Sequence, residues 1–308
     1  MDDTLSIVIP AYRAAYLATA LDSLADQTDK RFQVIVGDDA SPDDIRSICS
    51  LYSPALDLTY HRFRENKGAT SLTAQWDRCV DLSSGAWVLL LGDDDAIDPE
   101  FVAAFRRTLK ETNASFDVYR FQSRWIDADG KTTRVSDPPP LEEQWFQYLA
   151  ERFRDRRFTF TCDHVFSRES YRRAGGFVDF PLAWCSDDAS WIAFSARTGF
   201  RTVPGPLASW RRSGLNISSD IPQLRRTKLI SMSLFLDWLG QRMRSGDLRC
   251  QSDREQLLSL GVAWFFDRYW TGPSPLSLSE CFRVGKRLST FAPKMSLRIH
   301  LRLLRHYL

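Results

Sequence analysis

Short apolar runs alternate with helix-like patterns in the amino-terminal third of the chain. Between the runs, leucines such as Leu17, Leu21 and Leu24 recur at helical spacing and predict amphipathic helices. The runs expected to form buried strands are Leu5–Ile9, Phe32–Val36, Leu58–Phe63 and Trp87–Leu91. Strands that alternate with helices form a mostly parallel sheet with helices on both faces. We therefore expect an α/β fold with a Rossmann-like sheet.

Polar residues predict where several helices begin. Ser41 followed by Pro42 suits a helix N-cap and first helical position. Asp98 followed by Pro99 has the same arrangement ahead of the next helical pattern. A further helix is expected from about residue 70 to residue 82, just before the fourth strand.

Acidic residues follow two of the expected strands. Asp38 and Asp39 end the second strand, and Asp93, Asp94 and Asp95 follow the fourth. Ligands of parallel sheets bind beyond the carboxyl ends of the strands, so both groups should open into one crevice. Adjacent carboxylates repel each other, which favours a bound cation, and oxygen ligands suit Mg²⁺ or Mn²⁺. The alternative is an acidic turn that caps the helix near Pro99.

The last third of the chain has a different pattern. Helices are expected over residues 224–243, 254–270 and 276–288, with breaks at Gly246 and at residues 272–275. From Cys281 onwards there are many cations and no acidic residue. The leucines and isoleucine interleaved with these cations are Leu297, Ile299, Leu301, Leu303, Leu304 and Leu308. This segment either lies on an anionic membrane surface or packs its leucines on the catalytic domain or a second subunit.

Composition excludes several classes of protein. A net charge of +2 argues against a dedicated nucleic-acid-binding protein. The six cysteines form no CxxC pair, which argues against a zinc site and a disulfide framework. We see neither a signal peptide nor an uninterrupted apolar stretch of about 18 residues. We expect a cytoplasmic protein, with peripheral contact at the inner face of the plasma membrane if the basic tail binds lipid.

Four segments together resemble the family 2 glycosyltransferases, which have the GT-A fold and act in bacterial polysaccharide and O-antigen synthesis. The segments are Ser6–Tyr12, Leu21–Thr28, Val34–Ser41 and Gly85–Asp95. The resemblance covers about residues 4–220. It implies a catalytic domain over residues 1–220, with a nucleotide-sugar half to about residue 97 and an acceptor half beyond it. Residues 221–308 would form a helical, membrane- or partner-binding extension.

The same resemblance implies a set of donor-binding residues. The residues assigned to the nucleotide-sugar are Pro10, Ala11, Tyr12, Asp38, Asp39, Lys67, Arg78, Asp93 and Arg211. A carboxylate such as Asp39 can accept a hydrogen bond from uracil N3–H or a ribose hydroxyl, although Asp39 could instead cap the following helix. Lys67, Arg78 and Arg211 could offset diphosphate charge or lie on a solvated surface.

The resemblance also assigns the metal site. Asp94 matches the metal-binding carboxylate of the DXD motif, with Asp93 and Asp95 beside it. The first aspartate of the motif falls on Gly92 or on Asp93, depending on the alignment. In the loop Trp210–Ser218, which resembles the segment that closes over the donor, Ser213 replaces a histidine that serves several relatives as a metal ligand.

A second acidic pair, Asp187 and Asp188, follows the turn Gly175–Phe177. In the resemblance, this pair precedes the acceptor-side helix, and Asp188 is the general base. It would take a proton from an acceptor hydroxyl as the oxygen attacks the anomeric carbon opposite the leaving nucleotide, which inverts the anomeric configuration. The alternative is that one of the two aspartates caps a helix over residues 189–197.

These expectations add up to an inverting, metal-dependent transferase. It would move a sugar from a nucleotide-sugar, with UDP-sugars favoured and dTDP- and GDP-sugars open, to a glycan or polyprenyl-linked oligosaccharide. A sugar nucleotidyltransferase is less favoured because no glycine-rich loop follows the first strand over residues 10–15. A catalytically inactive GT-A scaffold or binding protein is the alternative from another class.

Overall fold

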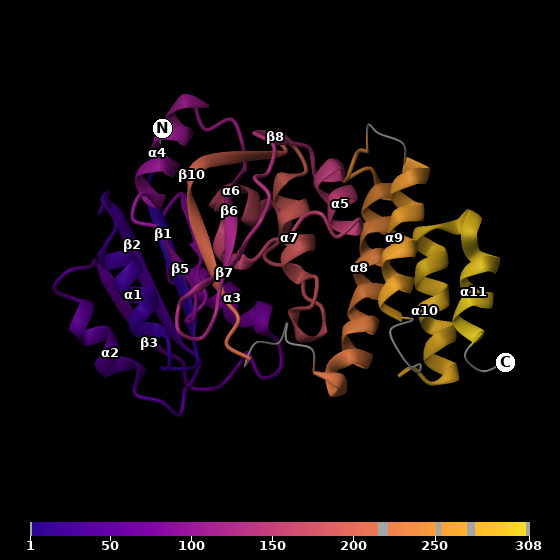
Figure 1. Ribbon diagram of the computed structural model, residues 1–308, viewed down its shortest axis with the longest axis horizontal. Helices are drawn as coiled ribbons and strands as arrows, with labels where there is room; N and C mark the ends of the chain where they lie inside the picture. Colours follow the sequence, from indigo (N-terminus) through magenta and orange to yellow (C-terminus); the bar gives the residue numbers. More distant parts are fainter. Residues whose placement is uncertain (1, 215–220, 251–253, 270–274, 306–308) are drawn as a thin grey trace.

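In a computed structural model, a single sheet occupies one side of the molecule and a set of helices the other (Figure 1). The structure describes residues 2–214, 221–250, 254–269 and 275–305. Several sequence-based expectations fall outside these ranges. They concern residues 215–218 of the loop expected to close over the donor, the expected helix end at Trp270, residues 272–274 of the expected break between two helices, and Leu308.

The amino-terminal half of the sheet is parallel, as expected. Its strands are β1 (Leu5–Ala11), β2 (Phe32–Asp38), β3 (Leu58–Arg62) and β4 (Trp87–Leu90). They lie in the order β3-β2-β1-β4, so the last three residues of β1 pair with the acidic end of β2. The intervening helices are α1 (Leu17–Ala25), α2 (Ile45–Tyr52) and α3 (Leu72–Asp81).

The second half of the sheet is mixed. The long strands β6 (Val118–Ile126) and β10 (Phe200–Arg211) are parallel, whereas β9 (His164–Ser167) runs antiparallel between β4 and β6. The short strands at its margins are β5 (Ala96–Ile97), β7 (Thr132–Val135) and β8 (Glu142–Glu143). The helices of this half are α4 (Phe101–Glu111), α5 (Trp145–Phe153), α6 (Arg168–Ala174) and α7 (Ser186–Ser195). The mixed α/β fold with a central sheet is confirmed.

Each face of the sheet has its own hydrophobic core. Ile7 and Ile9 of β1 face the core shared with α1 and α4, whereas Val8, between them, faces the core shared with α3 and α7. This alternation follows from the two-residue side-chain period of a strand. Burial on both faces explains why the strands are continuously apolar.

The carboxyl-terminal helices pack directly on one of these cores. They are α8 (Arg225–Ser245), α9 (Arg254–Tyr269), α10 (Leu278–Phe291) and α11 (Ser296–Leu304), and Figure 1 shows them side by side at the edge of the molecule. Phe235 of α8 and Trp264 of α9 contact Phe153 of α5 through their rings. Within the described parts of the chain, no helix is long and apolar enough to cross a bilayer.

Two expected helix starts are wrong. The helix expected from Ser41 begins at Ile45, because the side chain of Asp44 caps it by accepting a hydrogen bond from the Ser47 amide at 3.1 Å. Asp98 does not cap α4, since its carboxylate accepts from the Leu207 amide at 2.9 Å and from Arg124. At the first helix, the nearby acidic residue Asp44 acts as the cap instead of Ser41. At the second, tertiary hydrogen bonds engage the carboxylate of Asp98, which therefore does not cap the helix.

Candidate active site

The ends of β1, β2 and β4 meet at one edge of the sheet. Because β1 pairs in parallel with both neighbours, residues 10–12, Asp38–Asp39 and Asp93–Asp95 share this edge. Hydrogen bonds join the first group to the other two, and the Asp39 amide donates to the Ala11 carbonyl at 2.9 Å. Oδ2 of Asp93 accepts from the amides of Tyr12 and Arg13, at 2.8 and 2.9 Å. The loops that follow β1 and β4 are therefore joined at the edge where the sequence predicts a ligand crevice.

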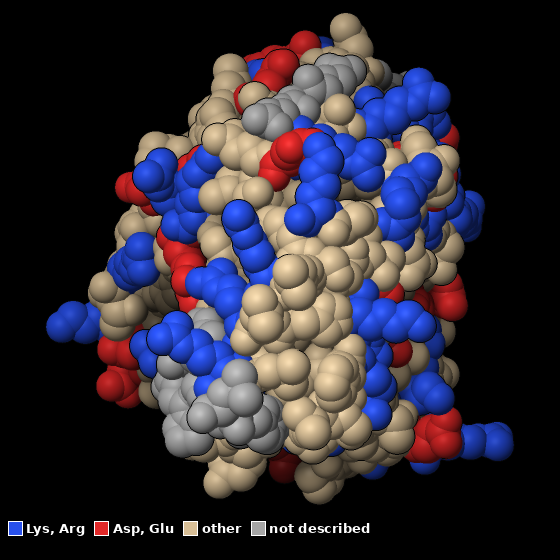
Figure 2. All heavy atoms as spheres, turned by 90° about the vertical axis from the view of Figure 1, so that its right-hand side faces the viewer, with Lys and Arg blue, Asp and Glu red and all other residues tan. Residues whose placement is uncertain are grey.

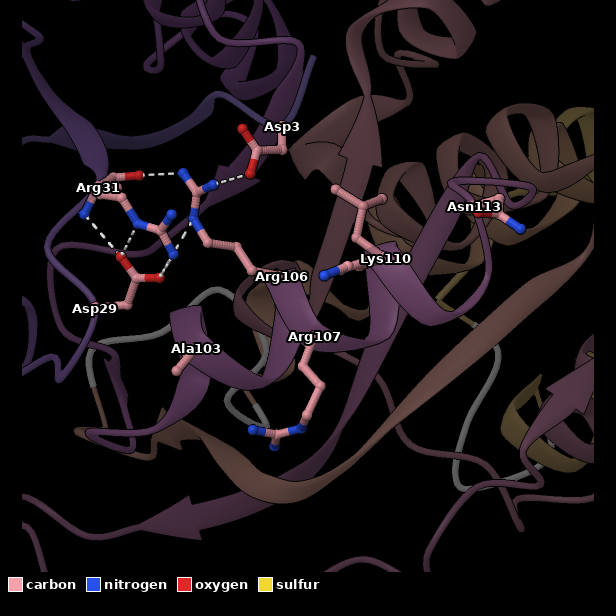
Figure 3. Close-up of a pocket in the computed structure, with 9 residues that line it drawn as sticks. Asp3, Asp29, Arg31, Ala103, Arg106, Arg107, Lys110 and Asn113 are labelled. Carbon is pink, nitrogen blue, oxygen red and sulfur yellow. Dashed lines mark hydrogen bonds and ion pairs between the residues drawn. The ribbon is translucent and has the colours of Figure 1, made fainter. Parts of the chain in front are cut away.

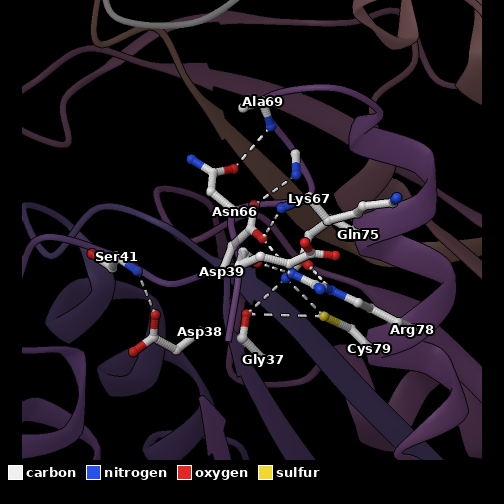
Figure 4. Close-up of polar contacts among 12 residues, drawn as sticks. Gly37, Asp38, Asp39, Ser41, Asn66, Lys67, Ala69, Gln75, Arg78 and Cys79 are labelled. Atoms are coloured by element: carbon white, nitrogen blue, oxygen red, sulfur yellow. Dashed lines mark hydrogen bonds and ion pairs between the residues drawn. The ribbon is translucent and has the colours of Figure 1, made fainter. Parts of the chain in front are cut away.

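Asp39 holds the loop over residues 66–68. Its two carboxylate oxygens accept from the amides of Lys67 and Gly68, at 2.7 and 2.8 Å, and it also forms an ion pair with Arg78 (Figure 4). An ideal Cβ built on Gly68 would lie 2.6 Å from Oδ2 of Asp39, so a glycine is needed for this close approach. Asp39 does not cap α2, whose cap is Asp44.

Arg78 of α3 is fixed in place rather than solvated. Its guanidinium lies over the ring of Phe63, 3.8 Å from the centroid, and donates to the carbonyl of Glu65 at 2.9 Å. Together with Asp39, it connects β2, α3 and the 66–68 loop (Figure 4). The ion pair with Asp39 already offsets the positive charge of Arg78.

Asp38, the last residue of β2, is fully buried. Its side chain has no accessible surface and accepts hydrogen bonds from the Ser41 amide, the Tyr60 hydroxyl and Arg62, at 2.8, 2.6 and 2.6 Å. These donors come from the loop after β2 and from the neighbouring strand β3. Asp38 therefore fixes the backbone on which Asp39 stands.

The three consecutive aspartates have different surroundings. Asp93 binds the backbone after β1, whereas Asp95 is buried and accepts from the Arg211 amide at 3.0 Å. Burial, followed by the nearby Asp94 carboxylate, raises the pKa of Asp95 well above its usual value. The side chain of Asp94 is half-buried. The sequence assigned all three aspartates to one metal site, but their side chains lie in three different environments.

Gly92 provides a test of whether a metal fits here. An ideal Cβ at Gly92 would lie 2.7 Å from Oδ2 of Asp95 and 3.1 Å from Oδ1 of Asp94, so these two oxygens face the same small space. Mg²⁺ commonly takes one or two carboxylates and fills its other positions with water and phosphate oxygens. Asp94 and Asp95 match that requirement, although the described residues include no cluster of three or more metal-ligating side chains.

Arg211 supports the loop that carries Asp93, Asp94 and Asp95, which we call the aspartate loop. Its side chain is buried, and it donates from Nε to the Asp94 carbonyl at 2.8 Å and from NH1 to the carbonyls of Asp127 and Ala128 at 2.9 and 3.1 Å. Its guanidinium also lies 4.5 Å from the centroid of the Tyr16 ring. These contacts give Arg211 a place under the loop rather than on its surface.

The second acidic pair lies in the first turn of α7. Asp188 is buried, and its carboxylate accepts from the Tyr148 hydroxyl at 2.6 Å and from Arg152 at 2.8 and 2.7 Å. Burial by itself would raise the pKa of Asp188, but the charge and hydrogen bonds of Arg152 and the Tyr148 hydroxyl lower it on balance. Asp188 therefore stays ionised.

Asp187 has the opposite character. It is half-buried, and burial together with the charge of Asp188 raises its pKa to about 7. Its Oδ1 accepts from the amide of Asp188 at 2.9 Å, which is a cap-like contact at the start of α7. The pair thus divides into an ionised, paired carboxylate and one that titrates near neutral pH.

Sequence reasoning missed Tyr148 and Arg152. They stand four residues apart on α5, so they share one face of that helix. This spacing indicates a common face, but nothing in the sequence indicated that the face meets α7. Their hydrogen bonds to Asp188 make them part of the site.

The backbone before the acidic pair is strained. Leu182, Ala183 and Cys185 have φ values of 61°, 50° and 69°, in the left-handed region that residues other than glycine rarely adopt. Helix α8 contacts this loop, because the Ser231 hydroxyl donates to the Pro181 carbonyl at 2.7 Å. Contacts with α8 therefore help to hold the loop that carries Asp187 and Asp188.

Residues of a short 3₁₀ turn, Thr161–Asp163, interact with both acidic groups. The Cys162 thiol hydrogen bonds to Asp95, and the charge of Asp163 acts on the pKa of Asp187. Consecutive residues of one turn are thus close to each acidic group. The metal-binding candidates and the proton-accepting candidates therefore border a common region.

A separate surface hollow lies at the other edge of the sheet. Arg106 of α4 pairs there with Asp3 and donates to the carbonyl of Arg31, and Asp29 and Lys110 also line it (Figure 3). Asp3 and Arg31 precede β1 and β2, so the hollow lies at the amino ends of these strands, opposite the carboxyl ends that carry the aspartates.

Comparison of the sequence with known proteins identifies the family of this chain. A model described as Glycosyl transferase family 2 matches residues 6–175. A PGL/p-HBAD biosynthesis glycosyltransferase of Mycobacterium bovis is 36% identical over 95 residues, which cover 30% of this chain and 36% of that protein. Glycosyltransferase GlyA of Streptococcus pneumoniae is 28% identical over 124 residues, which cover 40% of this chain and 17% of that protein. The chain thus matches about a third or less of the length of these relatives.

Solved structures show the same fold. Residues 1–349 of S. aureus TarS, in complex with UDP-GlcNAc, superpose with a TM-score of 0.70 at 16% identity, covering 99% of this chain and 89% of that one. The mannosyltransferase PcManGT from Pyrobaculum calidifontis, in complex with GDP-Man and Mn²⁺, gives a TM-score of 0.53 at 15% identity, covering 99% and 86%. The family match and the fold agree: this chain belongs to glycosyl transferase family 2.

Proposed function

We propose that this glycosyltransferase is an inverting, metal-dependent enzyme of cell-surface polysaccharide synthesis. It would move a sugar from a nucleotide-sugar, preferably a UDP-sugar, to a hydroxyl of a glycan or polyprenyl-linked oligosaccharide. The observation that carries the proposal is that Asp95 and Asp187 each interact with a residue of the turn Thr161–Asp163. One group suits a metal-bound diphosphate, and the other suits a proton acceptor.

The donor half of the site is assigned to the loops after β1, β2 and β4. Tyr12 exposes 39% of its surface at the end of β1, and its ring offers a stacking face for the nucleotide base. Pro10, Ala11 and Asp39 would complete the wall of that site, with Asp39 and Arg78 fixing the 66–68 loop, including Lys67, beside it. The nucleotide-sugars bound by TarS and PcManGT support a donor of this chemical class.

The metal site is assigned to Asp94 and Asp95, whose oxygens face the space above Gly92. Bound Mn²⁺ or Mg²⁺ would supply positive charge to the leaving diphosphate. Asp93 has a different task, because its hydrogen bonds to the amides of Tyr12 and Arg13 tie the aspartate loop to the end of β1. Arg211 supports the same loop from below.

The proton acceptor is assigned to Asp187, not to Asp188 as the family resemblance suggested. An acceptor hydroxyl oxygen would form a bond to the anomeric carbon while the bond from that carbon to the diphosphate oxygen breaks. The hydroxyl proton would pass to the Asp187 carboxylate. A base whose pKa lies near the working pH is the most effective, and Asp187 has a pKa of about 7. Asp188 is buried in its pair with Arg152 and serves to position the loop.

A direct test measures release of nucleoside diphosphate from UDP-, dTDP- and GDP-sugars with Mn²⁺ and candidate acceptors. The proposal expects turnover with one nucleotide class, loss of turnover on chelation, and a product of inverted anomeric configuration. A chain that binds donor but never transfers sugar with any acceptor would instead be an inactive scaffold. Retained configuration would exclude the single displacement.

A further inference from the structure

Helices α10 and α11 form an antiparallel pair at the end of the described chain. The Ser296 hydroxyl donates to that of Ser289 at 3.0 Å, and an ideal Cβ on Gly285 would lie 2.8 Å from Nε2 of His300. The two helices therefore approach closely at two levels. Their inner residues, such as Leu288 and Leu303, are buried. The outer surface of the pair is thus preformed rather than assembled on binding.

Large apolar side chains remain exposed on this outer surface. Leu278 and Phe282 of α10 expose 48% and 52% of their surface, and Leu297 and Leu301 of α11 expose 74% and 58%. In each helix the two residues stand four apart, so each pair forms part of one stripe. We call these four side chains the apolar ridge. The apolar residues of the tail therefore fall into two groups. Ile299 and Leu303 of α11 are buried, whereas Leu297 and Leu301 are exposed to water.

Cations accompany the ridge. Eight positions after the start of each stripe stands an exposed basic residue, Lys286 in α10 and Arg305 directly after α11. The other exposed cations of the two helices are Arg283, Arg298 and Arg302, whereas Lys294, in the turn between the helices, pairs with Glu255. Figure 2 looks onto the side of the molecule that these helices form and shows an uncharged band between groups of Lys and Arg. The segment from Cys281 onwards contains no acidic residue.

This combination selects the chemistry of the partner. A second copy of the chain would bring the same cations to the same face, so a two-fold contact would place like charges together. An anionic bilayer offers phosphate head groups to the cations and an apolar interior to the ridge. We propose that α10 and α11 dock on the surface of an anionic membrane, with the four ridge side chains inserted below the head groups.

Docking stands apart from sugar transfer, so its test does not depend on the proposed reaction. If both hold, docking would bring the site to a polyprenyl-linked acceptor. Helix α8 contacts α10 through Arg287, which donates to the Ser233 hydroxyl at 3.2 Å, and contacts the loop before Asp187 through Ser231. A continuous set of packed helices therefore connects the proposed membrane surface to the acceptor side of the site.

The test is co-sedimentation of the full chain with vesicles of phosphatidylcholine alone or mixed with phosphatidylglycerol. We expect binding to the mixed vesicles that weakens as salt is raised. Replacing both ridge leucines of α11 (L297S/L301S) should weaken binding at least tenfold. Replacing Lys286 and Arg298 (K286S/R298S) should weaken it about 25-fold, because each cation near an anionic surface contributes about fivefold.

Matched variants elsewhere on the surface serve as controls. Leu51 of α2 exposes 79% of its surface, so L51S removes an equally exposed leucine. Arg107 and Lys110 of α4 are exposed, so R107S/K110S removes the same charge as the basic double variant. Neither control should change binding by more than about twofold. All variants should keep the melting temperature of the parent chain.

Three results would overturn the proposal. The first is no binding to mixed vesicles at low salt. The second is equal binding of L297S/L301S and the parent. The third is a concentration-dependent dimer in light scattering that L297S/L301S abolishes, since a second copy would then be the occupant of the ridge.

Discussion

Arg152 of α5 binds both carboxylate oxygens of Asp188 in α7, with Nε 2.8 Å from Oδ1 and NH2 2.7 Å from Oδ2. This pair keeps one aspartate ionised and occupied. Burial, followed by the negative charge of Asp188, raises the pKa of the neighbouring Asp187, and Arg152 partly opposes that effect. We therefore propose Asp187 as the proton acceptor, in place of Asp188, which the family resemblance suggested.

The two aspartates should respond differently to loss of charge. Asp187→Asn should lower turnover by about 10²-fold or more, with unchanged donor affinity and melting temperature. Asp188→Asn leaves Arg152 partly buried without its counter-charge, so it should destabilise the fold by roughly 3 kcal/mol. Steady-state kinetics and thermal unfolding of both variants separate the roles. If Asp188→Asn unfolds like the parent and alone loses turnover, Asp188 is the base.

The pH profile should show the coupling of this pair. A base must be deprotonated, so turnover should rise with pH through an apparent pKa of about 7 and level off above it. Arg152→Gln removes a cation that lowers the pKa of Asp187, so the rising limb should move to higher pH. Asp188→Asn removes a negative charge and should move it to lower pH. A limb that stays fixed in both variants would mean that another group titrates.

Gly68, in the 66–68 loop, offers a steric test of the proposed donor site. A methyl group on Gly68 would meet Oδ2 of Asp39 at 2.6 Å, so Gly68→Ala must displace the loop or the carboxylate. We expect nucleotide affinity to fall about tenfold in calorimetry, with turnover at saturation little changed. Ala69→Ser, at the exposed next position, is the control. Equal affinities in the two variants would separate the 66–68 loop from the donor site.

The sequence predicted the parallel half of the sheet, the approximate helix positions and the family, because periodicity and strand-end aspartates are local signals. The roles within the site depended on partners from distant segments. Arg152 lies 36 residues from Asp188 and Arg211 lies 117 residues from the Asp94 carbonyl that it binds. No local pattern predicted these contacts. The same limit applied to Asp98, which is held by Leu207 and not by its own helix.

Strain before the acidic pair should trade stability for activity. Ala183 has a φ of 50°, and Ala183→Gly relieves this strain, so stability should rise by up to about 1 kcal/mol. The looser loop should position Asp187 less well and lower turnover several-fold. Ala114→Gly is the matched control, because Ala114 has a φ of 51° in the turn after α4. Turnover that is unchanged in Ala183→Gly would show that the loop needs no strain.

The proposed donor site binds a nucleotide together with a divalent cation. The most direct measurement is the thermal-unfolding shift with UDP, dTDP or GDP, each with and without Mn²⁺, in the parent chain and in Asp94→Asn. A ligand at a hundredfold excess over Kd stabilises the folded state by about 2.7 kcal/mol. We expect a shift for one nucleotide, preferably UDP, that requires Mn²⁺ and disappears in Asp94→Asn. A parent chain that shifts with none of the three nucleotides, or shifts equally without Mn²⁺, would contradict the proposed site.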